Sequence, residues 1–525
     1  MSFSSLLAAS QTQTTFQVIP VLVLLPVFGA IAVALTPNAR IGVHKMLATI
    51  FTGITGAISV WLLTAFETNG EFQFISQQTW IKSLGIEWFA GVDGISLFLV
   101  VLTGLLFPFV VIAINPKHDH KAYYIWIQLL QTGCMGVFVS LDLFMFFVFF
   151  EIVLIPMYFL IGKWGHGNAQ YAATKFFLYT MFGSALMLVS IVSLAVLHAQ
   201  NSDTELTFNL LEIATNPAIA TNTSRLLFLG FALAFAVKVP LFPVHTWLPD
   251  AHTEAPTAGS VILAGVMLKL GTYGFIRFGL FLFPEASHFF APLFLTLGVI
   301  GIVYGALVSM VQEDLKKLVA YSSVNHMGYT LLGMAAVIAA AEMNGGNLIS
   351  AQAGLGGAVF QMFNHGTISA MLFILVGVIY DRAHHRDIEG FGGLATQMPI
   401  YTAFVAIAFF AGLGLPGFSG FVSEAMIFIG AFPVFKAIVI MSTLGILLNA
   451  AYFLWAFQRM FFGPANEKYN DIPEINRREV LTLLPLAVIT LILGVYPRPF
   501  LDLVAATLNV LIDSVVSFGG LASAM

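Results

Sequence analysis

The chain has 525 residues, of which 59% are apolar and only 9% are charged. Charged residues usually make up about 25% of a soluble domain, so this sequence lacks the polar surface that a soluble protein of its length needs. The single cysteine, Cys134, excludes an intrachain disulfide and leaves too few ligands for iron–sulfur clusters or thiolate zinc sites. A net charge of −5 without a basic block argues against a nucleic-acid partner. The composition indicates an all-α polytopic membrane protein.

Apolar runs of about 18 residues or more predict fourteen membrane-spanning helices. Residues 1–15 lack the basic start of a cleaved signal peptide, so the first run is expected to stay in the protein as a helix. A last apolar stretch, Pro499–Leu521, carries Asp502 and Asp513 and is predicted to form an amphipathic tail. The predicted spans lie near residues 16–35, 43–66, 91–114, 122–140, 142–161, 172–197, 224–244, 257–283, 289–310, 318–340, 357–380, 399–430, 434–460 and 480–497.

The positive charges predict how these helices are oriented. Thirteen of the 21 Lys and Arg residues fall in alternate connections, and the positive-inside rule places those connections in the cytoplasm. The N-terminus is then expected on the lumenal or periplasmic side. The longest connections, about 67–90 and 198–223, are too short for a nucleotide-binding βαβ unit of 30 or more residues.

Six ionisable residues stand inside predicted spans, where each costs at least about 2.5–3.5 kcal/mol. If Glu151 and a lysine formed one buried ion pair, that pair could serve helix packing alone. Either histidine alone could also be a satisfied core imidazole. Six such groups on six helices favour a functional polar pathway. These residues are Glu151, Lys238, Lys269, His326, His365 and Glu424.

Their chemistry favours proton transfer. Burial lowers the pKa of a lysine and raises that of a glutamate, and a nearby opposite charge reverses both effects. A lysine with a movable partner can therefore bind and release a proton, and histidine can bridge such groups. A sodium site would more often have clustered carboxylates and carbonyls. Asp142, at the start of its span, is interpreted as an interfacial group or helix cap.

Two spans contain helix breakers. Lys238 precedes Pro240 and Pro243, and the twelfth span contains the glycine-rich segment Gly412–Gly420 with Pro416. Paired breaks are typical of inverted-repeat transporters, which predicts two inverted five-helix repeats, helices 4–8 and 9–13, with breaks in helices 7 and 12. The corresponding division of the chain is 1–121, 122–283, 289–460 and 461–525. A G-x-G-x-x-G pattern at Gly412 follows no strand, so we reject a dinucleotide site there.

Three segments resemble signatures of the antiporter-like membrane subunits of complex I. They are Lys238–Pro256 (KVPLFPVHTWLPDAHTEAP), Asp314–Gly328 (DLKKLVAYSSVNHMG) and Phe363–Gly366 (FNHG). The resemblance covers nearly the whole chain. Glu424, where sister chains usually carry lysine, and the absence of a long lateral helix point to the chain 4 type, NuoM or NdhD. The sequence of Gly417–Glu424 (GFSGFVSE) resembles that of the cyanobacterial or plastid NdhD branch.

The resemblance implies roles for the six residues. Glu151 and Lys238 would be the ion pair of an input half-channel, Lys269 the central relay, His326 and His365 its bridges, and Glu424 the outlet group. The chain itself would bind no cofactor. NAD(P)H or ferredoxin, iron–sulfur clusters and quinone, here plastoquinone, would belong to the other subunits of the complex. The expected location is a cyanobacterial thylakoid membrane, or otherwise a bacterial plasma membrane.

The sequence therefore predicts a proton-translocating, non-redox subunit of an NAD(P)H or ferredoxin–quinone oxidoreductase. The alternative is a subunit of an Mrp-type Na⁺/H⁺ antiporter, because that class shares all three signatures. A haem-carrying cytochrome subunit would need paired intramembrane histidines as axial ligands. Only His326 and His365 lie deep in spans, so we reject that reading.

Overall fold

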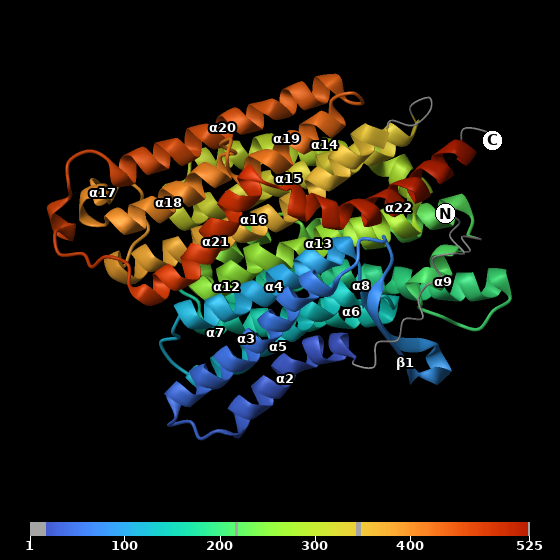
Figure 1. Cartoon of the computed structure of the whole chain (residues 1–525), viewed down its shortest axis with the longest axis horizontal. Helices are drawn as coiled ribbons and strands as arrows, with labels where there is room; N and C mark the ends of the chain where they lie inside the picture. Colours follow the sequence, from blue (N-terminus) through green and yellow to red (C-terminus); the bar gives the residue numbers. More distant parts are fainter. Residues whose placement is uncertain (1–16, 216–218, 343–347, 523–525) are drawn as a thin grey trace.

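Long helices run side by side along one axis of the molecule (Figure 1). The computed structural model describes residues 17–215, 219–342 and 348–522. Eleven helical stretches in these ranges are long and apolar enough to cross a membrane. They are α2 (Val18–Leu35), α3 (Ile41–Ala65), α4 (Gly94–Ala113), α5 (His120–Val139), α6–α7 (Leu143–Trp164), α8 (Ala169–Ser202), α12–η3 (Thr257–Leu280), α14 (Pro284–Met310), α16 (Leu348–Ala383), α20 (Lys436–Phe461) and α21 (Arg477–Val495).

Further helices complete the bundle. They are α10 (Thr221–Lys238), α15 (Leu315–Glu342), α18 (Pro399–Gly412), α19 (Ser419–Ala431), α22 (Arg498–Ala522) and the short α9 (Leu210–Thr215), α11 (Trp247–Glu254) and α17 (Leu394–Gln397). The prediction of an all-α membrane protein is confirmed. The count of fourteen, the inverted repeats and the division into four segments stay predictions. The prediction that residues 1–15 are not a cleaved signal peptide concerns residues that lie outside the described ranges.

Both predicted breaks are present. The helix predicted over 224–244 ends at Lys238, and α11 begins only at Trp247. The twelfth predicted span is divided into α18 and α19 by residues 413–418, where Gly414 and Gly417 have φ of +78° and +100°. A residue with a side chain rarely adopts these angles, so glycine permits the break.

Two irregularities were not predicted. The fifth span is divided at Val153, because Pro156 has no N–H to donate to the carbonyl of Ile152, four residues earlier. The eighth span contains two π-helical segments, η2 (Leu263–Met267) and η3 (Phe275–Leu280), on either side of α13 (Leu268–Gly274). π-Helical turns are rare and are often found at functional sites.

The α12–η3 stretch and α16 form the centre of the bundle. Both are buried along the full window that identifies them as spans, whereas only 33% of the corresponding windows of α3, α20 and α21 is buried. The polar residues of the central helices therefore face protein and not lipid, as intramembrane polar groups require.

The two ends of the bundle differ. One carries α17, and the other carries a β-hairpin of β1 (Gln73–Ile81), η1 (Lys82–Leu84) and β2 (Ile86–Val92) (Figure 1). The hairpin lies almost entirely within the connection predicted over about residues 67–90. At the same end Asp142 caps α6, since its Oδ1 accepts a hydrogen bond of 2.8 Å from the Met145 N–H. The interpretation of Asp142 as a cap is confirmed.

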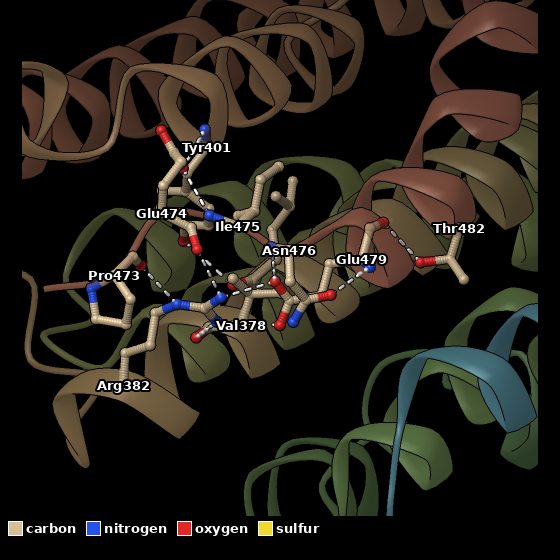
Figure 2. Close-up of polar contacts among 10 residues, drawn as sticks. Val378, Arg382, Tyr401, Pro473, Glu474, Ile475, Asn476, Glu479 and Thr482 are labelled. Atoms are coloured by element: carbon tan, nitrogen blue, oxygen red, sulfur yellow. Dashed lines mark hydrogen bonds and ion pairs between the residues drawn. The ribbon is translucent and has the colours of Figure 1, made fainter.

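Arg382 ties three segments together at the α17 end (Figure 2). Its guanidinium binds both carboxylate oxygens of Glu479 at 2.7 and 3.1 Å and donates to three backbone carbonyls, those of Val378, Pro473 and Glu474. The Glu474 carboxylate in turn accepts hydrogen bonds from the first N–H groups of α18. These contacts fix the long connection between α20 and α21, which includes η4 (Glu467–Tyr469).

The predicted amphipathic tail forms α22. Its buried residues recur every three or four positions, which gives the helix one apolar face. Thr507 Oγ1 accepts a hydrogen bond of 3.0 Å from the Gly94 N–H at the start of α4, and Gln352 of α16 donates to Asn509. The helix therefore packs across the β1 end of α4 and α16. The buried residues are Phe500, Val504, Thr507, Leu508, Leu511, Ile512 and Val515.

Candidate functional site

Lys269 lies at the centre of the bundle, fully buried in α13. In the π-helical turn just before it, the Leu268 N–H bonds to the Leu263 carbonyl, five residues earlier. This wider turn departs from the regular hydrogen-bond ladder of an α-helix, and the neighbouring Ala264 carbonyl accepts a hydrogen bond of 2.5 Å from Lys269 Nζ. The π turn therefore supplies a polar anchor for a lysine surrounded by apolar helices.

His365 of α16 is the second partner of Lys269. Its Nδ1 lies 2.6 Å from Lys269 Nζ. The two helices approach closely because Gly265 and Gly366 face each other: a Cβ on Gly366 would lie 2.8 Å from the Gly265 carbonyl oxygen. Nε2, the other ring nitrogen of His365, has no hydrogen-bond partner among the described residues. The imidazole thus has one nitrogen on the lysine and one free to accept or donate.

Glu424 and His326 form the other end of the same constellation. Glu424 Oε1 lies 3.3 Å from His326 Nδ1, close enough for an ion pair but without hydrogen-bond alignment. Glu424 stands in the second turn of α19, just after the helix break, and a Cβ on Gly414 would lie 2.8 Å from its Oε2. The predicted break therefore places glycine backbone against the carboxyl group.

A small cavity joins the two pairs. His326, His365 and Glu424 line it, together with Gln361 and Ser369 of α16. It has room for about one water molecule. The rings of His326 and His365 have centroids 5.7 Å apart, a separation that one bridging water can span. Lys269, His365, His326 and Glu424 therefore form one nearly continuous polar chain across four helices.

Glu151 and Lys238 lie apart from this chain and are not directly paired. Lys238 Nζ has no hydrogen-bond partner in the described part of the chain, and no ion pair within 4.0 Å joins it to Glu151. The Nζ atom instead lies over the ring of Phe150, 4.6 Å from its centroid. Glu151 lies within electrostatic range of Lys238, next to Ser184 of α8. The resemblance implied a direct ion pair, whereas here an aromatic ring occupies the position next to the ammonium group.

The helix end that carries Lys238 nevertheless packs against the helix that carries Lys269. A Cβ on Gly271 would come within 2.7 Å of the Val239 side chain and 2.9 Å of the Phe235 carbonyl. The end of α10 is therefore packed directly on α13, two residues from Lys269. The structure joins four of the six predicted residues and places the other two on the neighbouring helices.

His252 is a candidate that sequence reasoning missed. It is fully buried in α11, stacks on Phe373 of α16 with centroids 4.6 Å apart, and neither ring nitrogen has a hydrogen-bond partner among the residues described. Lys269 and Lys316 are both within electrostatic range of it. The residue stood inside the signature segment Lys238–Pro256, but that segment looked like a loop, and only the fold shows its burial.

Ser423 and Gln361 were missed for a different reason. Ser423 Oγ donates a hydrogen bond of 2.5 Å to Gln361 Oε1 beside the cavity. Uncharged polar residues are common in such helices, and nothing in the sequence distinguishes these two. In residues 17–215, 219–342 and 348–522, no group of three or more His, Cys, Asp or Glu side chains could hold a metal ion.

Comparison with known proteins gives the family. Residues 140–449 match the family described as "NADH:quinone oxidoreductase/Mrp antiporter, TM". The chain belongs to this family. It is 42% identical over 478 residues to NADH-quinone oxidoreductase subunit M of Rhodobacter capsulatus, with 90% of each chain covered. The family resemblance stated from the sequence is confirmed, whereas the cyanobacterial branch stays a prediction.

Two solved structures are similar in fold. A chain of respiratory complex I from Thermus thermophilus is 28% identical, with a TM-score of 0.82 over 94% of this chain and 99% of that chain. A chain of the Mrp complex from Dietzia is 19% identical, with a TM-score of 0.79 over 96% and 100% of the two chains. At that identity the second likeness shows the fold alone.

Proposed function

We propose that this chain is a proton-translocating, non-redox membrane-arm subunit of an NADH–quinone oxidoreductase of the complex I type. The buried chain of Lys269, His365, His326 and Glu424 is the observation that carries the proposal. Burying such a row of ionisable groups within a membrane costs free energy, and rows of this kind typically mark a transport pathway. The named relative and the Thermus chain belong to complexes of this type, which supports the same function.

Proton transfer along the row follows from its chemistry. A neutral imidazole has one donor and one acceptor nitrogen, so it takes a proton on one nitrogen and releases another from the opposite one. His365 does this between Lys269 Nζ and the cavity, and His326 does it between the cavity and the Glu424 carboxyl. A water molecule in the cavity carries the proton between the two rings.

Glu151 and Lys238 supply a gate to this row. An opposite charge that approaches a buried lysine favours its protonated form, and withdrawal of that charge favours proton release. The absence of a direct ion pair in the described structure leaves the two side chains room to approach and separate. We propose that a change in their separation controls delivery of a proton toward Lys269.

The setting in the cell is a further part of the proposal. The α17 end, which carries the positively charged connections, faces the cytoplasm, and the β1 end faces the lumen or periplasm. The segment Gly417–Glu424 favours a cyanobacterial thylakoid complex with plastoquinone as acceptor and NAD(P)H or ferredoxin as donor. The cofactors and quinone belong to partner subunits, and extraction of the quinone from the purified complex tests this choice.

The second candidate is a subunit of an Mrp-type Na⁺/H⁺ antiporter. The matched family favours it, because its description names Mrp antiporters beside NADH:quinone oxidoreductases. The intramembrane site contains two lysines and two histidines and only two carboxylates, a composition that suits protons better than sodium ions. Subunits that co-purify in mild detergent separate the two: quinone-reductase subunits support the first proposal, and Mrp subunits the second.

Glu424→Gln tests the proposed function directly. Glutamine keeps the shape of the side chain but cannot take up and release a proton. In an assembled complex reconstituted into vesicles, we expect proton translocation driven by quinone reduction to fall by about 10²-fold or more. Glu389→Gln is the control, because Glu389 is exposed at the α17 end, paired with Arg459. Normal translocation in Glu424→Gln would remove this residue from the pathway.

A further inference from the structure

Three polar side chains near Glu424 have no part in the pathway described above. They are Tyr329 of α15 and Asn449 and Tyr452 of α20, and all three are fully buried. Neither phenol hydroxyl, nor either polar atom of the Asn449 amide, has a hydrogen-bond partner among the described residues. An unpaired buried polar group destabilises the fold, so three such side chains together call for a function or for bound water.

Their positions form a connected strip. The Tyr329 ring lies 6.3 Å from that of His326 and 5.6 Å from that of Phe428 on α19. Its hydroxyl points toward α20, since a Cβ on Gly445 would lie 2.7 Å from that oxygen. Asn449 and Tyr452 follow Gly445 at four and seven residues, so all three occupy the same face of α20.

Glu424 is the ionisable group beside this strip. Its carboxyl lies within electrostatic range of both phenols, and Tyr452 also approaches the Ser322 side chain on α15. On α15 and α20, Tyr329 lies opposite Gly445 and Ser322 lies opposite Tyr452. The two helices therefore run antiparallel. The strip therefore starts beside Glu424 and His326 and leads toward the α17 end of the bundle.

We infer that Tyr329, Asn449 and Tyr452 form a second proton-conducting branch, which runs from Glu424 to Ser322 and so extends toward the α17 end of the bundle. The inference rests on the proposed function, because it deepens the role of Glu424. In each transfer a phenol oxygen accepts a proton from one neighbour while its own O–H proton passes to the next, so no phenolate forms. The Asn449 amide binds water between the two phenols and acts as a positioning residue.

The branch gives Glu424 two routes of exchange. On one side it receives protons through His326, and on the other it exchanges them through the phenols. A purely structural role is the alternative, in which the rings pack and the hydroxyls are incidental. The two readings differ in what loss of a hydroxyl does, since phenylalanine preserves the ring and its packing.

The experiment compares Tyr329→Phe, Tyr452→Phe and Asn449→Leu in the assembled complex. We expect each to lower proton translocation about 10²-fold without loss of assembly. Asn449→Ser, which keeps a polar group for water, should recover most of the translocation lost in Asn449→Leu. Tyr401→Phe is the matched control, because Tyr401 is equally buried but its hydroxyl donates to the Leu375 carbonyl on α16.

A second readout follows the carboxyl group itself. Infrared difference spectra of Tyr452→Phe should show a shifted C=O stretching band for protonated Glu424, identified by its loss in Glu424→Gln. Wild-type translocation in all three variants, or an unshifted band in Tyr452→Phe, would overturn the branch. If Glu424→Gln itself translocated normally, the proposed function would fail instead, so the two failures are distinguishable.

Discussion

Lys269 and His365 lie 96 residues apart in the chain, and their side chains share a hydrogen bond of 2.6 Å at the centre of the bundle. The contact connects α13, in the predicted first repeat (122–283), with α16, in the predicted second repeat (289–460). A proton that reaches Lys269 therefore passes from one predicted repeat to the other through one imidazole. Among the described residues, this is the only side-chain hydrogen bond between Lys269 and the predicted second repeat.

Replacement of His365 tests that contact. Glutamine in its place can still accept a hydrogen bond from Lys269 but has no second ring nitrogen to release a proton. We expect His365→Gln to reduce proton translocation by about 10²-fold, the lower bound for a group that transfers protons. Thr367→Val is the control, because the Thr367 hydroxyl donates only to the Asn364 carbonyl of its own helix. Equal translocation in the two variants would exclude His365 as a relay.

The Glu151 and Lys238 variants test the gate. We expect Glu151→Ala and Lys238→Ala each to abolish translocation, and the double variant not to recover it. A direct structural pair would predict recovery, because breaking such a pair strands a buried charge at a cost of about 3–5 kcal/mol and the double variant strands none. Since no direct ion pair is present, we expect the stability coupling between the two sites to stay below about 1 kcal/mol. A double variant that assembles and pumps at the wild-type rate would contradict the mechanism.

Arg382 is expected to matter for stability and not for proton transfer. Arg382→Met leaves the Glu479 carboxylate buried without its bidentate partner, at a cost of about 3–5 kcal/mol. Arg459→Met removes a far more exposed pair with Glu389 and should cost less than about 1 kcal/mol. The thermal denaturation midpoint of the purified protein in detergent should therefore fall much further in the first variant. Similar midpoints would show that the guanidinium contributes little.

His385 predicts a pH dependence at the α17 end. Its Nδ1 accepts a hydrogen bond of 3.2 Å from the Asp387 N–H, and its Nε2 contacts the Tyr469 hydroxyl, so the ring is neutral with the proton on Nε2. Burial, together with the nearby Lys468, holds the pKa of His385 below its ordinary value of 6.5. When the contact between His385 and Tyr469 is broken, His385 regains its ordinary pKa and binds a proton more readily than in the folded state. The stabilisation from this contact is therefore retained at neutral pH and is lost as pH falls below about 6.5.

Hydrogen exchange measures this effect. Amides of the connection around Tyr469 should exchange faster, relative to intrinsic rates, at pH 5.5 than at pH 7.5, values chosen about one unit on either side of 6.5. In His385→Asn the dependence should disappear. A wild-type protection that does not change with pH would mean that His385 does not anchor the connection.

The sequence predicted the site well where charge made residues conspicuous. A lysine or glutamate within an apolar run is recognisable without any structure, because its burial is costly. The breaks after Lys238 and before Glu424 were also predictable, since proline and glycine act locally on the backbone. The family resemblance rested on the same segments, and the comparisons confirmed it.

The remaining features depend on tertiary contacts. The π turn before Lys269 contains no proline, and the sequence gives no sign that the Ala264 carbonyl bonds to the lysine. The side chain that lies next to Lys238 is Phe150, the residue before the glutamate that the resemblance pointed to. The phenols of Tyr329 and Tyr452 become candidates only because packing leaves their hydroxyls without partners. None of these follows from residue type alone.

Helix α22 has a consequence for the order of assembly during biosynthesis. Its apolar face covers α4 and α16, where Phe500 packs on Phe98, Phe360 and Phe363. A ribosome produces all of these helices before it reaches α22, so the aromatic surface between them stays uncovered while the later spans are inserted. The nascent bundle therefore leaves this aromatic surface of α4 and α16 uncovered until α22 has been translated, and a chain released earlier would present it to lipid or to a chaperone.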